Sequence, residues 1–75
     1  MKTANDLKIG DIITNFNSAF TLTGVIIDFY STDGAFIKGH VKPLTTKKGT
    51  TLSELEGITP RFAFNKKTPL QNILV

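Results

Sequence analysis

The side chains of this chain that could carry out acid–base or nucleophilic chemistry are one histidine and six carboxylates, and there is no cysteine. His40 lies between Lys38 and Lys42 in a stretch that alternates like a strand. A histidine that acts as a general base needs an orienting partner and a nearby nucleophile. The neighbouring residues supply neither, and close lysines would disfavour the protonated ring. We therefore interpret His40 as a surface contact residue and expect no enzymatic activity.

Four of the carboxylates fit structural roles. Asp11 fits a turn, Asp33 a hairpin loop and Glu54 a helix cap, and Asp28 fits a cross-strand pair with Lys38. One histidine, no cysteine and scattered acidic residues do not form a zinc or calcium motif. The glycines are spread singly, so there is no phosphate-binding loop. We expect neither a metal nor a cofactor.

Residues 22–42 predict a β-hairpin. Apolar and polar residues alternate on both sides of Ser31-Thr32-Asp33-Gly34, as expected for half-buried strands around a tight turn. The inward face would carry Val25, Ile27 and Phe29 from the first strand and Ala35, Ile37, Gly39 and Val41 from the second. The outward face would be aromatic and basic.

Two loop lengths compete for this hairpin. A two-residue Asp33-Gly34 turn would place Lys38 opposite Phe29 and mix the two faces. A three-residue loop, with Gly34 in the left-handed conformation, keeps the apolar residues together. We favour it because burial of one face fixes the register of a strand pair. The pairs would be Val25–Val41, Asp28–Lys38, Phe29–Ile37 and Tyr30–Phe36.

The segments on either side of the hairpin predict short elements. Residues 7–13 form a turn that enters a first strand running to about Phe16, and residues 15–20 favour a loop. Pro43 should end the second hairpin strand, and a polar loop follows over residues 45–50.

Two capping-box patterns mark the C-terminal half. Thr51-Leu52-Ser53-Glu54 predicts one helical turn, with Leu55 facing inward and Gly57 as the stop. Residues 61–65 predict a strand with both phenylalanines on one face. Thr68-Pro69-Leu70-Gln71 predicts a 3₁₀-like turn, and a last strand over residues 72–75 should close the sheet.

Composition sets the class of protein. The 75 residues predict one small domain, residues 1–75, with a limited core. The absence of cysteine excludes disulfides and suits a reducing cytoplasm. The first residues lack the apolar run of a signal peptide, and no apolar stretch is long enough to span a membrane. We expect a cytoplasmic protein that does not bind membranes.

Three short motifs point to a fold family. Lys8-x-Gly10-Asp11-x-Ile13, then Thr23-Gly24-Val25-Ile26 before a hairpin, and the ending Pro69-Leu70-Gln71-Asn72-Ile73 resemble SH3-like small barrels of the KOW and Tudor type. The resemblance covers the chain except residues 45–60, which look like an insertion. It implies a mostly β fold, an antiparallel barrel of four to five strands with one or two short helical turns. Such barrels occur in ribosomal and transcription proteins, in histone-tail readers and in a plasmid-borne dihydrofolate reductase, whose substrate-binding motif is absent here.

The charge distribution favours a polyanion as the partner. Residues 1–34 carry two lysines and four aspartates, a net charge of −2, whereas residues 35–75 carry seven basic and two acidic residues, a net charge of +5. Aromatic rings stack on bases and lysines contact phosphates. We therefore expect a nucleic-acid-binding module, with RNA preferred, that uses Tyr30, Phe36, Lys38, His40, Lys42, Lys47, Lys48, Arg61, Lys66 and Lys67.

The same residues are compatible with three alternative roles. The lysines could simply keep the surface of a small barrel soluble. The apolar residues of the outer face could pack beneath a loop or mediate self-association. The chain could also be an accessory factor, an inhibitor or adaptor that docks on a larger protein.

Overall fold

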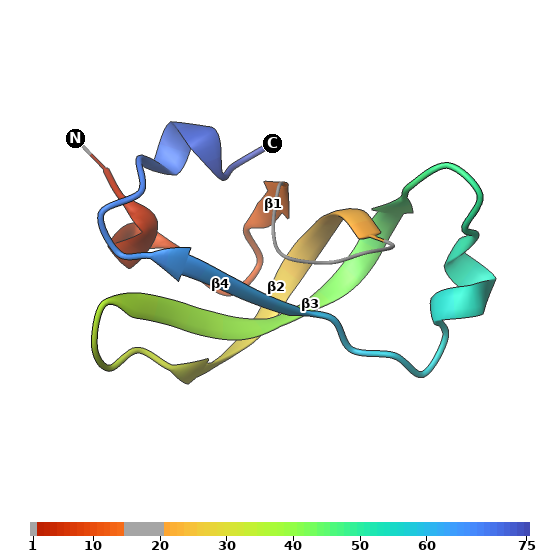
Figure 1. The fold of residues 1–75 in the computed structure, drawn as a ribbon, viewed down its shortest axis with the longest axis horizontal. Helices are drawn as coiled ribbons and strands as arrows, with labels where there is room; N and C mark the ends of the chain where they lie inside the picture. The colour runs from red at the N-terminus through yellow and green to blue at the C-terminus, as the bar shows by residue number, and fades with distance from the viewer. Residues whose placement is uncertain (1, 15–20) are drawn as a thin grey trace.

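The computed structural model describes residues 2–14 and 21–75 and shows a curled antiparallel sheet of four strands in the order β1-β2-β3-β4. The strands are β1 (Ile12–Thr14), β2 (Thr21–Ser31), β3 (Phe36–Thr46) and β4 (Arg61–Asn65). Three short 3₁₀ turns accompany them: η1 (Ala4–Asp6), η2 (Leu52–Leu55) and η3 (Leu70–Asn72). Figure 1 shows the two long strands, β2 and β3, running along most of the molecule in a curled sheet. The mostly β class predicted from the sequence is confirmed. The predicted loop over residues 15–20, and the end of the first strand, lie outside the described residues.

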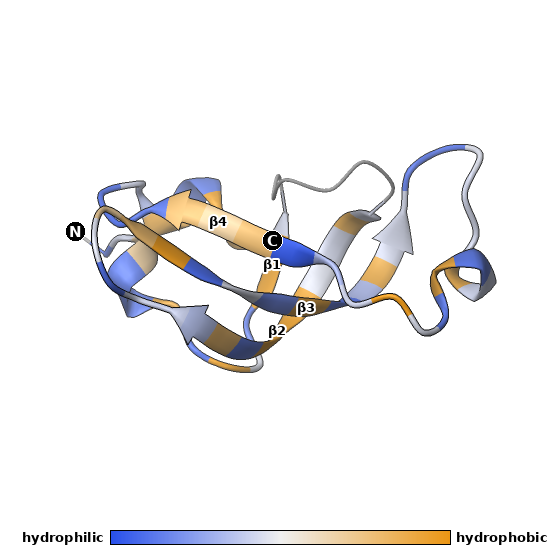
Figure 2. Ribbon diagram, turned by 60° about the horizontal axis from the view of Figure 1, so that its bottom comes forward, coloured by the Kyte–Doolittle hydropathy of each residue, from blue (hydrophilic) through white to orange (hydrophobic). Residues whose placement is uncertain are grey.

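The core lies on the concave side of the sheet. Apolar positions recur along β2 and β3 (Figure 2), and buried residues alternate with more exposed ones from Phe36 to Lys42 of β3. The N-terminal segment with η1 and the C-terminal segment with η3 cover the concave side and add their own apolar side chains. The buried cluster comprises Ala4, Leu7, Ile13, Ile26, Ile37, Val41, Phe62, Leu70 and Ile73.

A β-bulge in β2 changes the predicted register. Between the pairs Ile26–Val41 and Asp28–His40, β2 advances two residues while β3 advances one. The extra residue shifts the alternation of inward and outward side chains. Ile26, which is 1% exposed, faces inward, and the next inward residue is Phe29. Ile27 lies between them and is 44% exposed. The predicted inward positions of Phe29, Ile37, Gly39 and Val41 are confirmed, but those of Val25, Ile27 and Ala35 are wrong. Val25 pairs with the exposed Lys42, and Ala35 is exposed in the turn.

The predicted pairs across the hairpin are also wrong. Val25 already pairs with Lys42 rather than Val41, and the bulge adds a further shift toward the loop. Phe29 pairs with Gly39 rather than Ile37, and Asp28 with His40 rather than Lys38. A second shift follows between Phe29 and Ser31, so four residues, 32–35, separate the strands instead of three. Gly34 nevertheless has the predicted positive φ, +75°.

Pro43 does not end β3, contrary to the sequence-based prediction. The strand continues to Thr46, and Pro43 pairs with Gly24 of β2. On the other side of β3, the last pair with β4 is His40–Arg61. The N–H of Val41 still donates to the carbonyl of Pro60 at 2.9 Å, and Pro43 lies beyond this bond on the same side, where a residue without an N–H is tolerated.

The segment between β3 and β4 extends beyond the sheet (Figure 1). The backbone N–H of Thr51 donates to the Glu54 carboxylate at 3.3 Å, as the capping-box pattern predicts. Leu55 is buried and Gly57 has φ +83° at the stop. The predicted helical turn and the strand over residues 61–65 are both confirmed.

The predicted last strand is reduced to a bridge. Leu74 pairs with Ile13 of β1, and the N–H of Thr14 donates to the carbonyl of Ile73 at 2.8 Å. The C-terminal residues therefore lie beside β1, on the side opposite β2. In residues 2–14 and 21–75, no helix has the length and apolar character needed to cross a membrane.

Candidate nucleic-acid interface

The outer face of β2, β3 and β4 brings together five of the ten residues predicted to bind nucleic acid. Lys38, His40 and Lys42 alternate along β3 with the buried Ile37, Gly39 and Val41 and therefore point outward. Neighbouring strands add Tyr30 from β2 and Arg61 from β4, which pairs directly with His40.

Asp28 and His40 form the most defined contact on this face. Oδ1 of Asp28 lies 2.7 Å from Nδ1 of His40 and also accepts the backbone N–H of His40 at 3.1 Å. The His40 side chain is 25% exposed and that of Asp28 52% exposed. One carboxylate oxygen therefore fixes both the backbone and the ring of His40.

Nothing in the sequence indicates this pair. The predicted register places Asp28 opposite Lys38. The observed register already differs by one residue at Val25–Lys42, and the bulge shifts it by one more, which brings Asp28 opposite His40. Asp28 is thus a site residue that the sequence-based prediction missed, and the orienting partner that His40 lacks within its own strand comes from the neighbouring one.

Tyr30 connects the histidine to the arginine. Its ring centroid lies 5.0 Å from that of His40, with the planes tilted by 41°. The guanidinium carbon of Arg61 lies 5.8 Å from the Tyr30 centroid, within the range of a cation–π contact. Tyr30 is 49% exposed, so part of its ring remains accessible.

Phe36 lies farther along the same face. The sequence predicts it beside Tyr30, but it pairs with Asn65 of β4, and Tyr30 lies between the pairs Phe29–Gly39 and Ser31–Lys38. Phe36 is 47% exposed. Side chains two residues apart on one strand are separated by about 6.6–6.8 Å. Phe36, Lys38, His40 and Lys42 therefore form an evenly spaced row.

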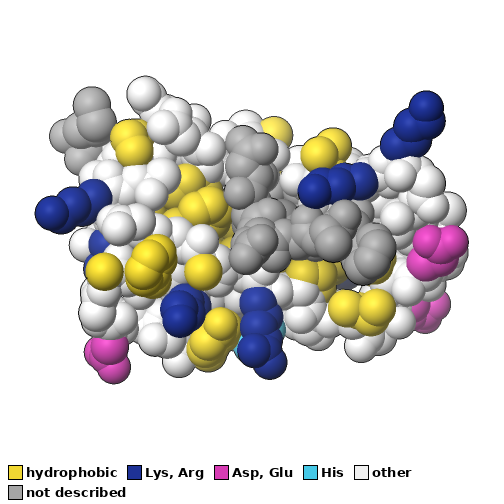
Figure 3. Space-filling model, in the orientation of Figure 1, with side chains coloured by type: hydrophobic (Ala, Val, Ile, Leu, Met, Phe, Trp, Pro, Cys, Tyr) yellow, Lys and Arg dark blue, Asp and Glu magenta, His cyan; other side chains and the backbone are white. Residues whose placement is uncertain are grey.

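The other four predicted residues lie at the two ends of the molecule. The N–H of Lys66 donates to the carbonyl of Ala35 at 2.9 Å, which places Lys66 and Lys67 beside the hairpin loop. Lys47 and Lys48 lie in the turn after β3, at the opposite end (Figure 1). On the face drawn in Figure 3, Lys and Arg side chains are spread along the length of the molecule, with hydrophobic side chains between them.

The Asp28–His40 pair bears on the chemistry that is open to His40. An aspartate on Nδ1 orients histidine as in general bases. However, Nε2 of His40 has no hydrogen-bond partner in the part of the chain that the structure describes. The described residues also contain no group of three or more potential metal ligands.

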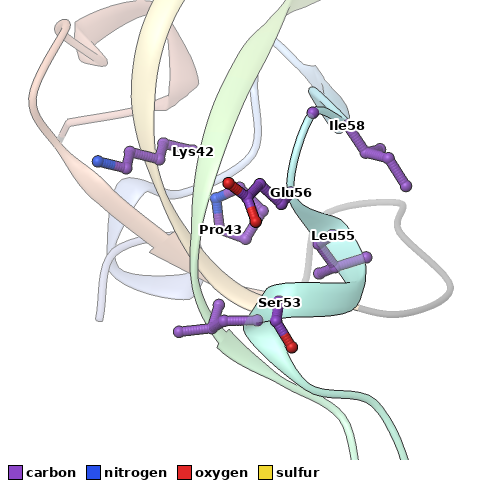
Figure 4. Close-up of a pocket in the computed structure, with 8 residues that line it drawn as sticks. Lys42, Pro43, Ser53, Leu55, Glu56 and Ile58 are labelled. Carbon is purple, nitrogen blue, oxygen red and sulfur yellow. The ribbon is translucent and has the colours of Figure 1, made fainter.

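A second feature is a shallow groove of about 440 Å³ beside η2. Figure 4 shows Lys42 and Pro43 of β3 on one side and Ser53, Leu55, Glu56 and Ile58 on the other. Leu52, which also lines the groove, is 51% exposed, and Ile58 is 55% exposed. The groove is open and partly apolar.

Comparisons of the chain with protein-family models, with curated proteins and with solved structures find no match.

Proposed function

We propose that this protein is a non-enzymatic, cytoplasmic module that binds single-stranded nucleic acid, with RNA preferred, on the outer face of β2, β3 and β4. The observation that carries the proposal is the row of Phe36, Lys38, His40 and Lys42 on one strand, flanked by Tyr30 and Arg61. Aromatic and cationic side chains that alternate along one surface are typical of proteins that bind single strands.

The two aromatic rings would supply the stacking. Base–aromatic stacking contributes about 1–3 kcal/mol per base and tolerates any sequence. Phe36 and Tyr30 are each about half exposed. A base on Tyr30 would extend the contacts that this ring already makes with Arg61 and His40.

The positive charges on this face would contact phosphates. Lys38, Lys42 and Arg61 outnumber the single carboxylate of Asp28, which gives the face a net charge of +2 with His40 neutral. The resemblance of the sequence to SH3-like small barrels supports the same function, since several of those barrels occur in ribosomal and transcription proteins.

Fluorescence anisotropy with labelled oligo-U, oligo-dT and a short duplex tests this proposal. We expect binding to the single strands at low salt, weakened severalfold by Lys38→Ala or Lys42→Ala. Lys48→Ala is the matched control, because it removes the same charge far from the row. The absence of binding to all three probes at low salt would overturn the proposal.

A protein partner is the second candidate function, and the groove beside η2 favours it. Exposed leucine and isoleucine side chains around a groove are typical of surfaces that bind other proteins. In that case the chain would be an accessory factor that docks on a larger protein.

Nuclease treatment separates the two functions. Complexes captured from a lysate that survive nuclease, and are lost with Leu52→Ala or Ile58→Ala, would favour the protein partner. Complexes lost on nuclease treatment and with Lys38→Ala would favour nucleic acid.

A further inference from the structure

We propose that His40, held by Asp28, accepts a hydrogen bond from a ribose 2′-hydroxyl and thereby makes this surface prefer RNA over DNA. This inference rests on the proposed binding of single strands and names the group on the nucleic acid that His40 contacts. The contact uses Nε2, the ring nitrogen that Asp28 leaves free.

The Asp28 contact determines which nitrogen carries the proton. An ionised carboxylate can only accept hydrogen bonds, so at 2.7 Å from Asp28 Oδ1 the Nδ1 of His40 must be the donor. In the neutral ring Nε2 is then an acceptor. The backbone bond from His40 N–H to the same oxygen holds the carboxylate in place.

Asp28 also determines what kind of group can lie at His40. Its carboxylate is 52% exposed and would repel a phosphate that approached this part of the face. A neutral donor is favoured instead. Among the parts of a nucleic-acid strand, the 2′-hydroxyl is a neutral donor that RNA has and DNA lacks.

The neighbouring lysines fit this placement. Lys38 and Lys42 lie on either side of His40 in the row, each about 6.6–6.8 Å away along β3. Phosphates drawn to the two lysines would bracket a sugar at His40. Lysine contacts do not discriminate RNA from DNA, so the discrimination falls to His40.

Three oligomers of one base isolate the 2′-hydroxyl. We would measure affinities for oligo-U as RNA, as oligo-dU and as 2′-O-methyl RNA, which keeps the ribose but cannot donate. The assay is run at pH 8, above the range in which histidines ordinarily titrate. The wild-type chain should bind RNA about threefold to tenfold more tightly than the other two, the effect of about one hydrogen bond.

His40→Ala should bind the three oligomers with equal affinity, close to that of the wild-type chain for oligo-dU. Lys38→Ala is the control and should weaken binding to all three oligomers by the same factor. Equal binding of all three by the wild-type chain would overturn this inference and the preference for RNA, while leaving the proposed binding of single strands intact. The absence of any binding would overturn both.

Asp28 acts through His40 as a positioning residue, and two substitutions test that role. Asp28→Asn can still accept both hydrogen bonds and should keep the preference for RNA, whereas Asp28→Ala should lose it. Because His40 is the only histidine, a long-range ¹H–¹⁵N spectrum reports its tautomer without ambiguity. The Nδ1–H form should dominate in the wild-type chain and in Asp28→Asn, but not in Asp28→Ala. A wild-type ring with its proton on Nε2 would overturn the inference.

Discussion

Gly39 lies at a point of close approach between β3 and its two neighbouring strands, β2 and β4. It pairs with Phe29 on one side and with Phe62 on the other. A Cβ built on Gly39 would collide with the carbonyl oxygen of Asp28 and come within 2.7 Å of the Phe62 ring. Glycine at this position therefore allows the bulge and the buried phenylalanine to coexist.

Gly39→Ala should lower the free energy of unfolding by about 2–3 kcal/mol, since neither the backbone nor a buried ring can move aside cheaply. Gly34→Ala is the comparison. Gly34 has φ +75°, and a Cβ built on it has no atom within 4 Å. Gly34→Ala should therefore lower the free energy of unfolding only by the backbone strain, about 1 kcal/mol. Urea denaturation of both variants measures the difference, and equal stabilities would contradict the close approach.

At the scale of the elements, the bulge in β2 decides which side chains face the core. Local signals are readable in the sequence because they act within a few residues: Thr51 and Glu54 predict η2, and Gly34 predicts a positive φ. The bulge depends on how two strands that are distant in sequence pair with each other, and no residue type near Ile27 predicts it. The position of Asp28 beside His40 depends on the bulge, so it could not be predicted either.

Adjacent isoleucines test this bulge. Ile26→Lys places a charge in the core and should unfold the domain, because an unpaired buried charge costs more than a small domain can tolerate. Ile27→Lys should change the melting temperature little, since its side chain is 44% exposed. Circular dichroism melts of the two variants measure this difference in stability. Simple alternation, with Val25, Ile27 and Phe29 inside, predicts the opposite order.

The segment around η2 depends on one anchor. Leu55 is 6% exposed, while Leu52 in the same turn is 51% exposed. Leu55→Ala should reduce the free energy of unfolding by roughly 2 kcal/mol, the low end for a buried leucine, and Leu52→Ala by less than about 0.5 kcal/mol. A similar loss in both, measured by chemical denaturation, would mean that η2 does not pack as described.

At the scale of the whole molecule, charge is distributed along an elongated body of 35 × 22 × 19 Å. The sequence identifies a basic C-terminal half, but it cannot show that Lys47 and Lys48 lie at one end and Lys66 and Lys67 at the other. The row on β3, with Tyr30 and Arg61 beside it, combines rings and charges on one face. The surface that we expect to bind is therefore smaller than the sequence alone suggests.

The salt dependence of binding should match this smaller surface. For single strands the slope of log K against log salt is about −0.7 per phosphate contacted, so about three or four contacts predict a slope near −2 to −3. Lys38→Ala and Lys42→Ala should each reduce its magnitude by about 0.7. Lys48→Ala should leave it unchanged. A reduction by Lys48→Ala and not by the other two would place the contacts elsewhere.

An NMR titration of the ¹⁵N-labelled chain with oligo-U tests most directly whether the outer face of the sheet binds RNA. We expect the backbone amide shifts of Tyr30, Phe36, Lys38, His40 and Arg61 to change as RNA is added, while those of Leu52 and Ile58 beside the groove stay unchanged. Changes confined to the groove, or no changes at low salt, would contradict binding on this face.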